Sequence, residues 1–417
     1  MAPVILITFA GRKARMEILT QYINKAIEKG IIDEWHIWDF ARSVEDRAWV
    51  TETFGPVKYM NEDADYRLIG KVSRLSPLRL DAKIAGDMHI CLLPHDDPQN
   101  FYEIVIGGWD NQQSVVRKMS RQNLKTFNRD NVANLLTFST PGILSPGLAN
   151  PIVLKVEENG VPVLSVNEVP LGRLAGVNLA NGADVMVRGG WGSDLEIMGV
   201  RDQIHRYVGP TNEKYPYHHT YAYYSSRAAD YADAIFVKCD DDIVYMNLDK
   251  LGDFINFRRE NPRPFIVSAN VVNNGVCAHL QQVSGAIPAS LGEFEMPPGG
   301  LGGTLWQSPQ RAGELHDFFL STPTKRLPLA KPVVEVEERV SINFISWLGR
   351  DLRHMGFRKL GDEPALSVYL PKLLNRPTAI YSDFIVSHLS FGPQEDGLDV
   401  DRLIASYDAL MRESLPE

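Results

Sequence analysis

The sequence predicts an α/β fold interrupted by an inserted antiparallel β-sandwich. Helical periodicity alternates with short apolar strand-like runs in residues 1–55 and again in residues 200–417. Residues 56–199 instead carry many short strand-like runs between turn signals, with almost no helical pattern. Because the first segment supplies only two strands, we expect it to join the third segment in one domain, split by the sandwich.

The composition is that of a globular protein and argues against several functions. The chain has 417 residues, of which 44% are hydrophobic and 23% charged, and a formal net charge of −9. The negative charge argues against nucleic acid as the main partner. Three cysteines far apart form neither a metal-spacing pattern nor a disulfide framework, which favours a reducing compartment. Without a visible signal core or an apolar run of about 20 residues, we expect a cytoplasmic protein with room for peripheral membrane contact.

The first 40 residues predict a strand–helix–strand unit. Residues 4–9 are typical of a buried strand, residues 13–29 of an amphipathic helix that ends at Gly30, and residues 35–40 of a second strand. A unit of this kind implies a parallel pair of strands.

The end of the first strand is a candidate phosphate-binding edge. Gly11 permits close approach of the backbone to a ligand, and Arg12 or Arg15 could meet a diphosphate. Asp39, at the end of the second strand, could contact a ribose or a base. The alternative is a plain strand–helix turn with surface arginines. The candidate binding residues at this edge are Thr8, Phe9, Ala10, Gly11, Arg12 and Asp39.

The middle segment predicts the sandwich strands. Glu158-Asn159-Gly160 is typical of a hairpin turn between two of them. Trp109 and Trp191 each follow a Gly-Gly pair and stand beside polar residues; exposed rings there would suit carbohydrate binding, and core positions are the alternative. Strands are expected at residues 88–93, 102–106, 114–117, 134–138, 152–156, 162–166 and 185–188.

The third segment returns to alternating helices and strands. A Gly-rich loop at residues 297–303 leads to Trp306, whose ring could stack on an acceptor sugar, unless the loop is only a surface connection. Helices are expected at residues 217–231, 248–259, 308–321 and 339–355, and strands at 234–237, 265–269 and 379–388.

Three consecutive acids, Asp240, Asp241 and Asp242, follow a buried apolar run. Carboxylates crowded at a strand end repel each other, and a divalent cation would relieve the repulsion. Side chains alternate in an extended segment, so we expect Asp240 and Asp242 to bind metal and nucleotide, and Asp241 to point away and tolerate change best. Lys238 shares the face of Asp240 and could balance its charge. His388, a lone histidine in a late strand, is a candidate third ligand or a structural histidine; as a ligand it favours Mn²⁺ over Mg²⁺.

Two acidic pairs are candidates for a general base. Glu337 and Glu338 precede the helix expected from residue 339, where the helix dipole would stabilise a charged carboxylate. Acids at a helix start are also ordinary caps. Asp362 and Glu363 form the second pair. We favour Glu338 as the group that takes a proton from an acceptor hydroxyl.

With these residues in view, the chain resembles a group of microbial GT-A-type glycosyltransferases over most of residues 1–55 and 200–395. The stretches that carry the resemblance are Trp38-Asp39-Phe40, residues 238–243, Arg339 to Ile345, Gly361-Asp362-Glu363 with Leu366 to Lys372, and His388 to Gln394. The resemblance implies a Rossmann-like core, Mn²⁺ or Mg²⁺ held by Asp240, Asp242 and His388, a UDP-sugar donor and a glycan acceptor. The group's Gly-Asp-Asp-Glu pattern is one acid shorter here.

Residues 85–195 resemble the domain named after farnesoic acid O-methyltransferase. The stretches are Phe101 to Asn111, Ser114 to Arg117 and Thr140 to Pro146. The resemblance implies a β-sandwich acting as a binding module, because a methyltransferase would need a Gly-rich strand–helix loop that this segment lacks. We therefore expect a metal-dependent glycosyltransferase of surface polysaccharide synthesis, and a lipid-linked acceptor would account for a peripheral membrane contact. The alternative is a non-catalytic, lectin-like protein on the same scaffold.

Overall fold

The chain forms two compact units, residues 1–50 with 217–417, and residues 51–216. The expected boundaries were 55/56 and 199/200; the second unit extends further because β3 (Val57–Met60) pairs in parallel with β15 (Ile204–Val208) inside it. The computed structural model describes residues 2–55, 57–61, 64–125, 132–190, 193–198, 203–210, 216–300, 302–357 and 361–415.

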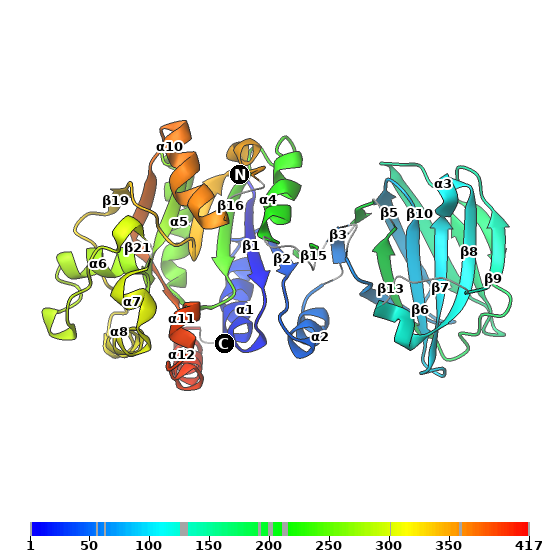
Figure 1. Ribbon diagram of the computed structural model, residues 1–417, viewed down its shortest axis with the longest axis horizontal. Coiled ribbons are helices and arrows are strands. Elements are labelled where there is room, and N and C mark those ends of the chain that lie inside the picture. The colour runs from blue at the N-terminus through cyan, green and yellow to red at the C-terminus, as the bar shows by residue number, and fades with distance from the viewer. Residues whose placement is uncertain are drawn as a thin grey trace. The chain divides into compact units, whose positions relative to one another are not determined.

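The first unit is built on a mixed sheet (Figure 1). Its strands, in spatial order, are β2 (Glu34–Asp39), β1 (Val4–Ala10), β16 (Ile235–Asp240), β20 (Phe344–Leu348), β18 (Ile266–Val272), β21 (Thr378–His388) and β17 (Ile243–Met246), with β19 (Val333–Val336) paired to β21. β1 runs parallel to β2 and β16, β18 runs parallel to β21, and β20 is antiparallel to both β16 and β18. The carboxyl ends of β1, β16 and β21 therefore lie at one edge of the sheet.

Helices pack against this sheet. α1 and α12 contact each other and β17, and α5 contacts β20 and β21. The predicted apolar face of α1 is buried at Met16, Leu19 and Ile23. The longer helices of the unit are α1 (Lys13–Glu28), α4 (Tyr217–Ser226), α5 (Leu248–Glu260), α6 (Gly275–Val283), α8 (Pro309–Ser321) and α12 (Val400–Ser414). The shorter turns are η2 (Ala289–Leu291), η3 (Pro298–Gly300), α7 (Gly303–Gln307), η4 (Gly349–His354), α9 (Asp362–Pro364), η5 (Ala365–Tyr369), α10 (Leu370–Leu374) and α11 (Gly392–Glu395).

The strand–helix–strand prediction for the first 40 residues is confirmed, because β1, α1 and β2 follow in order and the strands pair in parallel. The helix predicted at residues 339–355 is wrong. β20 and the 3-10 turn η4 occupy that segment, and β20 is inserted between β16 and β18 with Phe344, Ile345 and Trp347 fully buried. A short apolar run buried on both faces carries no periodicity that separates a strand from a helix.

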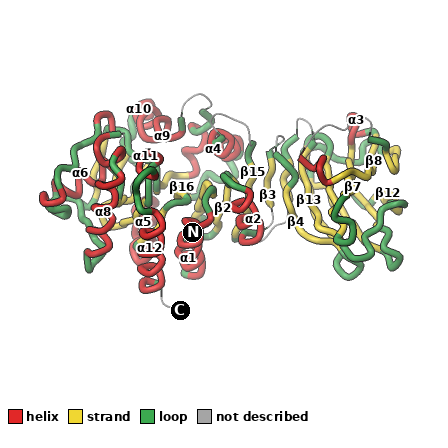
Figure 2. Tube along the Cα trace, turned by 60° about the horizontal axis from the view of Figure 1, so that its bottom comes forward, coloured by secondary structure: helices red, strands yellow, loops and turns green. Residues whose placement is uncertain are grey.

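The second unit is a sandwich of two sheets, as predicted. Figure 2 shows it as strands and loops with very little helix. Its main apolar cluster receives Ile90 and Ile104 from one sheet and Ile84 and Leu154 from the other, and a smaller cluster forms around Phe101. One sheet is antiparallel, in the order β4 (Arg67–Val72), β13 (Ala183–Gly189), β6 (Met88–Pro94), β7 (Asn100–Gly107), β8 (Gln113–Ser120) and β9 (Asn134–Ser139). The other has the order β12 (Val169–Arg173), β11 (Pro162–Val166), β10 (Ala149–Val156), β5 (Leu78–Ile84), β14 (Leu195–Met198), β3 and β15.

Connections in and beside the sandwich are short. The predicted hairpin turn joins β10 to β11, and Gly160 adopts a φ of 81° there with Ala180 packed where a side chain would stand. The helical pieces are α3 (Gly108–Asn111) and η1 (Arg121–Lys125), while α2 (Val44–Thr53) spans the change from the first unit to the second. Among the described residues, no helix is both long and apolar enough to cross a membrane.

Candidate functional site

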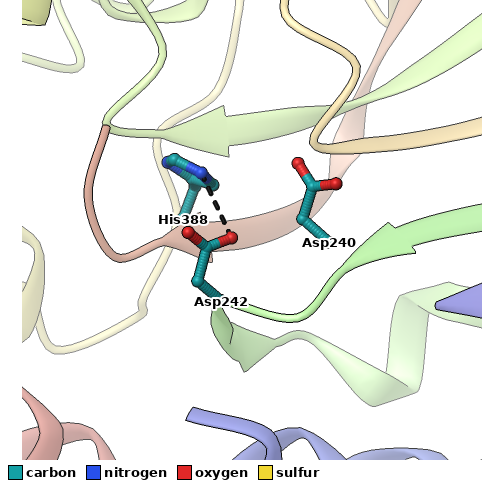
Figure 3. Close-up of side chains that lie close together, drawn as sticks. All are labelled: Asp240, Asp242 and His388. Atoms are coloured by element: carbon teal, nitrogen blue, oxygen red, sulfur yellow. Dashed lines mark ion pairs between the residues drawn. The ribbon is translucent and has the colours of Figure 1, made fainter. Parts of the chain in front are cut away.

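The topology brings the three predicted metal ligands together at one edge of the first unit's sheet. Asp240 ends β16, His388 ends β21, and Asp242 lies in the turn that leads into β17, whose Ile243 pairs with His388. Their side chains gather at one point (Figure 3), and one ligand atom from each lies within 4.8 Å of the others. Residues about 150 positions apart in the sequence thus form one cluster.

Asp242 is held in its ionised form by neighbouring cations. Its Oδ1 lies 3.2 Å from Nε2 of His388, and its Oδ2 accepts hydrogen bonds from Arg12 at 2.8 Å and Arg15 at 3.4 Å. Burial alone would raise the pKa of Asp242, but His388 and the two arginines outweigh it and hold the pKa far below its ordinary value. Asp242 is therefore ionised, and its charge is shared among His388, Arg12 and Arg15.

Asp240 is half-buried and paired with a cation from its own strand. Lys238 forms an ion pair with its Oδ1 and also donates to the carbonyl of Ile342 at 2.7 Å, while Asn343 Nδ2 donates to Asp240 Oδ2 at 3.2 Å. Burial raises the pKa of Asp240 and Lys238 opposes the rise, with the net pKa above its ordinary value. The predicted sharing of a face by Lys238 and Asp240 is confirmed.

Asp241 has a structural role that differs from the sequence expectation. Its Oδ2 accepts the backbone N–H of Gly11 at 2.9 Å, and its Oδ1 accepts from Arg12 Nη2 at 2.5 Å. The side chain is buried and ties the end of β1 to the end of β16. We expected Asp241 to point away and to tolerate change best; instead it fixes the arginine that faces Asp242.

These residues line a cavity of about 260 Å³. One wall is aromatic: the rings of Phe9 and Tyr217 stack with centroids 5.0 Å apart, and Phe40 meets Phe9 edge-on at 5.4 Å. The charged lining residues are three cations (Arg12, Arg42 and Lys238) and five carboxylates (Asp240, Asp241, Asp242, Asp362 and Glu363), a formal charge of −2 with neutral histidine. Arg15 and Arg339, which pair with Asp242 and Glu363 from outside the lining, offset part of this negative charge.

The cluster fits a divalent cation by two further observations. Nδ1 of His388 is buried and has no hydrogen-bond partner among the described residues, and the one neighbour of Asp242 Oδ1 is Nε2 of that same histidine at 3.2 Å. Two carboxylates and one imidazole are also a donor set that suits Mn²⁺. The observation that weighs against a resident metal is that Arg12, Arg15 and Lys238 already neutralise the same carboxylates.

Only some of the residues predicted at the phosphate-binding edge line the cavity. Phe9, Gly11 and Arg12 line the cavity, whereas Thr8 and Ala10 are buried away from it. Thr8 packs in the core, where its hydroxyl accepts a hydrogen bond from the indole of Trp35 at 3.0 Å. Asp39 is also absent from the described lining, and its Oδ1 accepts the backbone N–H of Ala41 at 3.2 Å.

The two candidate acid pairs lie in different places. Asp362 and Glu363 line the cavity, whereas Glu337 and Glu338 are exposed in the connection after β19 and are not among the described lining residues. The helix start on which the preference for Glu338 rested does not exist, because that segment leads into β20. Burial raises the pKa of Glu363, although Arg339, whose Nε lies 2.6 Å from the carboxylate, acts to lower it.

Several site residues escaped sequence reasoning. Glu395 accepts from Arg12 at 3.2 Å and from Arg15 at 2.9 Å, so it positions both arginines from the far end of the chain. Arg42 and Tyr217 line the cavity. The aromatic-rich stretch beginning at Tyr217 was the one available signal, but no spacing rule linked it to Phe9.

The Gly-rich loop expected to contact an acceptor is closely packed. Gly300 has a φ of 76°, and a side chain there would collide with the backbone of Arg339. The neighbouring Leu301 lies outside the described residues. A second cavity of about 720 Å³ opens along residues 302–304 of the loop, but half-buried Trp306 is not among its described lining residues. Of the two sandwich tryptophans, Trp109 is 52% exposed, and Trp191 lies outside the described part.

Comparison with known proteins supports the sandwich and no more than that. Residues 59–169 match the family model described as farnesoic acid O-methyltransferase, so a domain of this type stands within a mixed α/β protein. No glycosyltransferase family matches the chain, and no curated protein does.

Solved structures that resemble part of the chain are distant. The carbohydrate binding module CBM66 from Bacillus subtilis is 10% identical, with 35% of this chain and 93% of that chain covered and a TM-score of 0.24. The galectin LEC-6 from Caenorhabditis elegans is 12% identical, with 34% and 96% covered and a TM-score of 0.23. The β-agarase A from Zobellia galactanivorans is 12% identical, with 30% and 52% covered and a TM-score of 0.20.

Proposed function

We propose that the first unit is a metal-dependent glycosyltransferase of the GT-A type, which moves a sugar from a nucleotide-diphosphate sugar to a carbohydrate hydroxyl. The observation that carries the proposal is the convergence of Asp240, Asp242 and His388 in an acid-rich cavity at the carboxyl ends of β16 and β21. Ligands of open α/β sheets bind at this edge.

The charge of the cavity supports a metal–diphosphate pair as its occupant. The lining residues themselves carry a formal charge of −2, and a divalent cation bound together with the diphosphate would cancel it. Asp240, Asp242 and His388 would hold the cation, which would stabilise the negative charge that develops on the departing diphosphate. Mn²⁺ suits the histidine, and Mg²⁺ is the alternative.

The aromatic wall supports a nucleotide as the carrier of that diphosphate. The flat rings of Phe9 and Tyr217 offer an apolar surface for a base, within the same cavity as the acids. Uridine remains the base that we propose, with Gly11 and Arg12 next to the phosphates. A site for a cation alone would not need these aromatic side chains, so they favour a nucleotide as the ligand.

Glu363 is the residue that we propose as the general base, with Asp362 as its neighbour. Burial raises the pKa of Glu363, which makes its carboxylate a stronger base than an exposed glutamate. Arg339 holds the side chain in place at 2.6 Å. This assignment replaces Glu338, which is exposed outside the cavity.

The acceptor that we propose is a glycan of surface polysaccharide synthesis, reached from the cytoplasmic side of a membrane through a lipid-linked carrier. The test of the transferase is release of UDP from a panel of UDP-sugars, with Mn²⁺ and with a chelator present. Asp242→Asn is the matched variant, because it removes the charge and keeps the shape. Metal-dependent UDP release that Asp242→Asn abolishes is the expected result.

A carbohydrate-binding protein without catalytic activity is the second candidate. The observation in its favour is that Arg12, Arg15 and Lys238 already pair with the carboxylates of Asp240 and Asp242. A cluster neutralised in this way does not need a metal to balance its charge. Failure to release UDP from any donor, with sugar binding retained, would establish this candidate in place of the transferase.

A further inference from the structure

The sandwich unit carries an exposed tryptophan on a strained turn. The α3 turn joins β7 to β8 (Figure 1), and within it Trp109, Asp110 and Asn111 have φ angles of 52°, 56° and 60°. Left-handed backbone is strained at a non-glycine residue, and a bulky side chain is rare there. Trp109 is nevertheless 52% exposed, so its ring is not held there by core packing.

The turn is firmly fixed by the surrounding structure. Asn111 donates from Nδ2 to the carbonyl of Leu144 at 2.7 Å and accepts the Leu144 N–H at 3.1 Å. Gly107 has a φ of 69°, and a side chain there would collide with Leu144. Strain that is held in place by several contacts is typical of functional sites.

A buried ionic chain holds a guanidinium beside the ring. The Cζ of Arg117 lies 5.8 Å from the centroid of the Trp109 ring. Arg117 Nη1 donates to Glu103 at 3.2 Å, and Nε donates to Asn134 at 3.0 Å. Glu103 is fully buried and also accepts from the hydroxyl of Tyr66 at 2.7 Å. We call Trp109, Arg117 and Asn134 the Trp109 platform.

The platform offers a flat apolar ring and a hydrogen-bond donor with little net charge. Arg117 Nη2 has no hydrogen bond to a described residue, and the guanidinium lies over the Trp109 ring, so this group is a donor next to the indole. Glu103 neutralises the guanidinium, which argues against an anionic ligand. The exposed neighbours Gln112 and Gln113 are polar, whereas the centre of a protein interface is broadly apolar.

We propose that the Trp109 platform binds a neutral glycan, with a sugar ring stacked on the indole and a hydroxyl accepting a hydrogen bond from Arg117. A pyranose has an apolar face and a polar rim, which match the ring and the donors around it. This binding site is independent of the transferase chemistry in the first unit. The sandwich would then bind a glycan, in addition to any reaction at the first unit.

The experiment is affinity electrophoresis of the full chain in gels containing a neutral β-glucan, galactomannan or fructan, with an acidic alginate gel in parallel and a neutral-glycan array for shorter ligands. Trp109→Ala removes the ring but keeps a non-glycine residue at the same backbone angles, so the turn is unchanged. Trp109→Tyr retains a flat ring. Leu148→Ala is the matched control, because Leu148 is also a large exposed apolar side chain of this unit, at 65% exposure.

We expect retardation or array binding by at least one neutral glycan, weakened about tenfold or more in Trp109→Ala, partly restored in Trp109→Tyr and unchanged in Leu148→Ala. Circular dichroism will verify that each variant is folded. Binding of UDP with Mn²⁺ should be unchanged in Trp109→Ala, which separates this proposal from the transferase. No binding to any neutral glycan, binding to alginate alone, or binding that Trp109→Ala leaves intact would overturn it.

Discussion

At the residue scale, two members of the acidic triplet, Asp240 and Asp242, lie with His388 in one cluster, whereas Asp241 ties two strand ends together. The alternation of side chains along an extended segment predicted that Asp240 and Asp242 lie together, as they do beside His388, but not that Asp241 lines the same cavity. It could not predict the partners of Asp241, because Gly11 is 230 positions away in the sequence. For the same reason, the sequence did not indicate that Glu395 pairs with Arg12 and Arg15. Local pattern shows which side chains share a face, whereas tertiary contacts decide what each one meets.

Replacing Asp241 should destabilise the first unit. In Asp241→Ala the N–H of Gly11 and the guanidinium of Arg12 lose a buried acceptor, and we expect a loss of about 2 kcal/mol or more in the free energy of unfolding. Urea denaturation measures it. Asp249→Asn, at an 87% exposed aspartate, is the control and should change stability by about 0.5 kcal/mol or less. Equal effects in the two variants would refute the structural role of Asp241.

Replacing Glu363 should lower catalysis without loss of donor binding. Glu363→Gln keeps the shape of the side chain and removes its basicity, so we expect the rate of sugar transfer to fall by about 10²-fold or more with UDP binding unchanged. Glu338→Gln, at an exposed residue outside the cavity, is the control and should behave as wild type. A loss of transfer in Glu338→Gln alone would restore the assignment made from sequence.

At the element scale, strands and amphipathic helices were predicted well where periodicity or turn residues marked them. The α1 face and the β10–β11 hairpin are examples, because each follows from local physics. β20 was missed because Phe344 to Trp347 are buried in the middle of a sheet, where both faces are apolar. The site depends on this strand, since Asn343 at its start contacts Asp240.

A buried histidine links β21 to two helices and should make stability depend on pH. His316 of α8 lies 2.7 Å from the hydroxyl of Tyr407 in α12 and 2.9 Å from the carbonyl of Leu389. Burial lowers its pKa to about 4, against about 6.5 for an unfolded histidine. As the pH falls below about 6.5 the unfolded state takes up the proton first, so stability is lost progressively down to pH ~4.

The expected size of this effect is about 3 kcal/mol between pH ~7 and pH ~4. Urea denaturation of the wild type and of His316→Gln across this range measures it, because the difference between their pH profiles isolates the histidine. The wild type should lose more stability than the variant as the pH falls. Parallel profiles would show that His316 is not held neutral in the folded protein.

At the scale of the whole molecule, the chain is two units with separate cores. The apolar cluster of the sandwich extends from Val57 to Val208 and draws on the second unit alone. A contrast in periodicity predicted the insertion, because helical pattern stops near residue 55. The exact ends of the insertion could not be predicted, since the pairing of β3 with β15 carries no signal in composition.

A fragment of residues 51–216 should therefore fold by itself. We expect one cooperative thermal transition by circular dichroism and β-type far-ultraviolet spectra, because the fragment retains the whole cluster. Strong binding of a hydrophobic dye without a transition would show that the sandwich needs the first unit to fold.

We propose above that Asp240, Asp242 and His388 hold a divalent cation together with a nucleotide diphosphate. Titration of Mn²⁺ followed by electron paramagnetic resonance tests it most directly, because binding removes the signal of the free ion. We predict that the wild type with UDP takes up Mn²⁺ stoichiometrically, that Asp242→Asn loses this uptake by about 100-fold or more in affinity, and that Asp249→Asn retains it. No uptake by the wild type, or equal uptake by Asp242→Asn, would contradict the account.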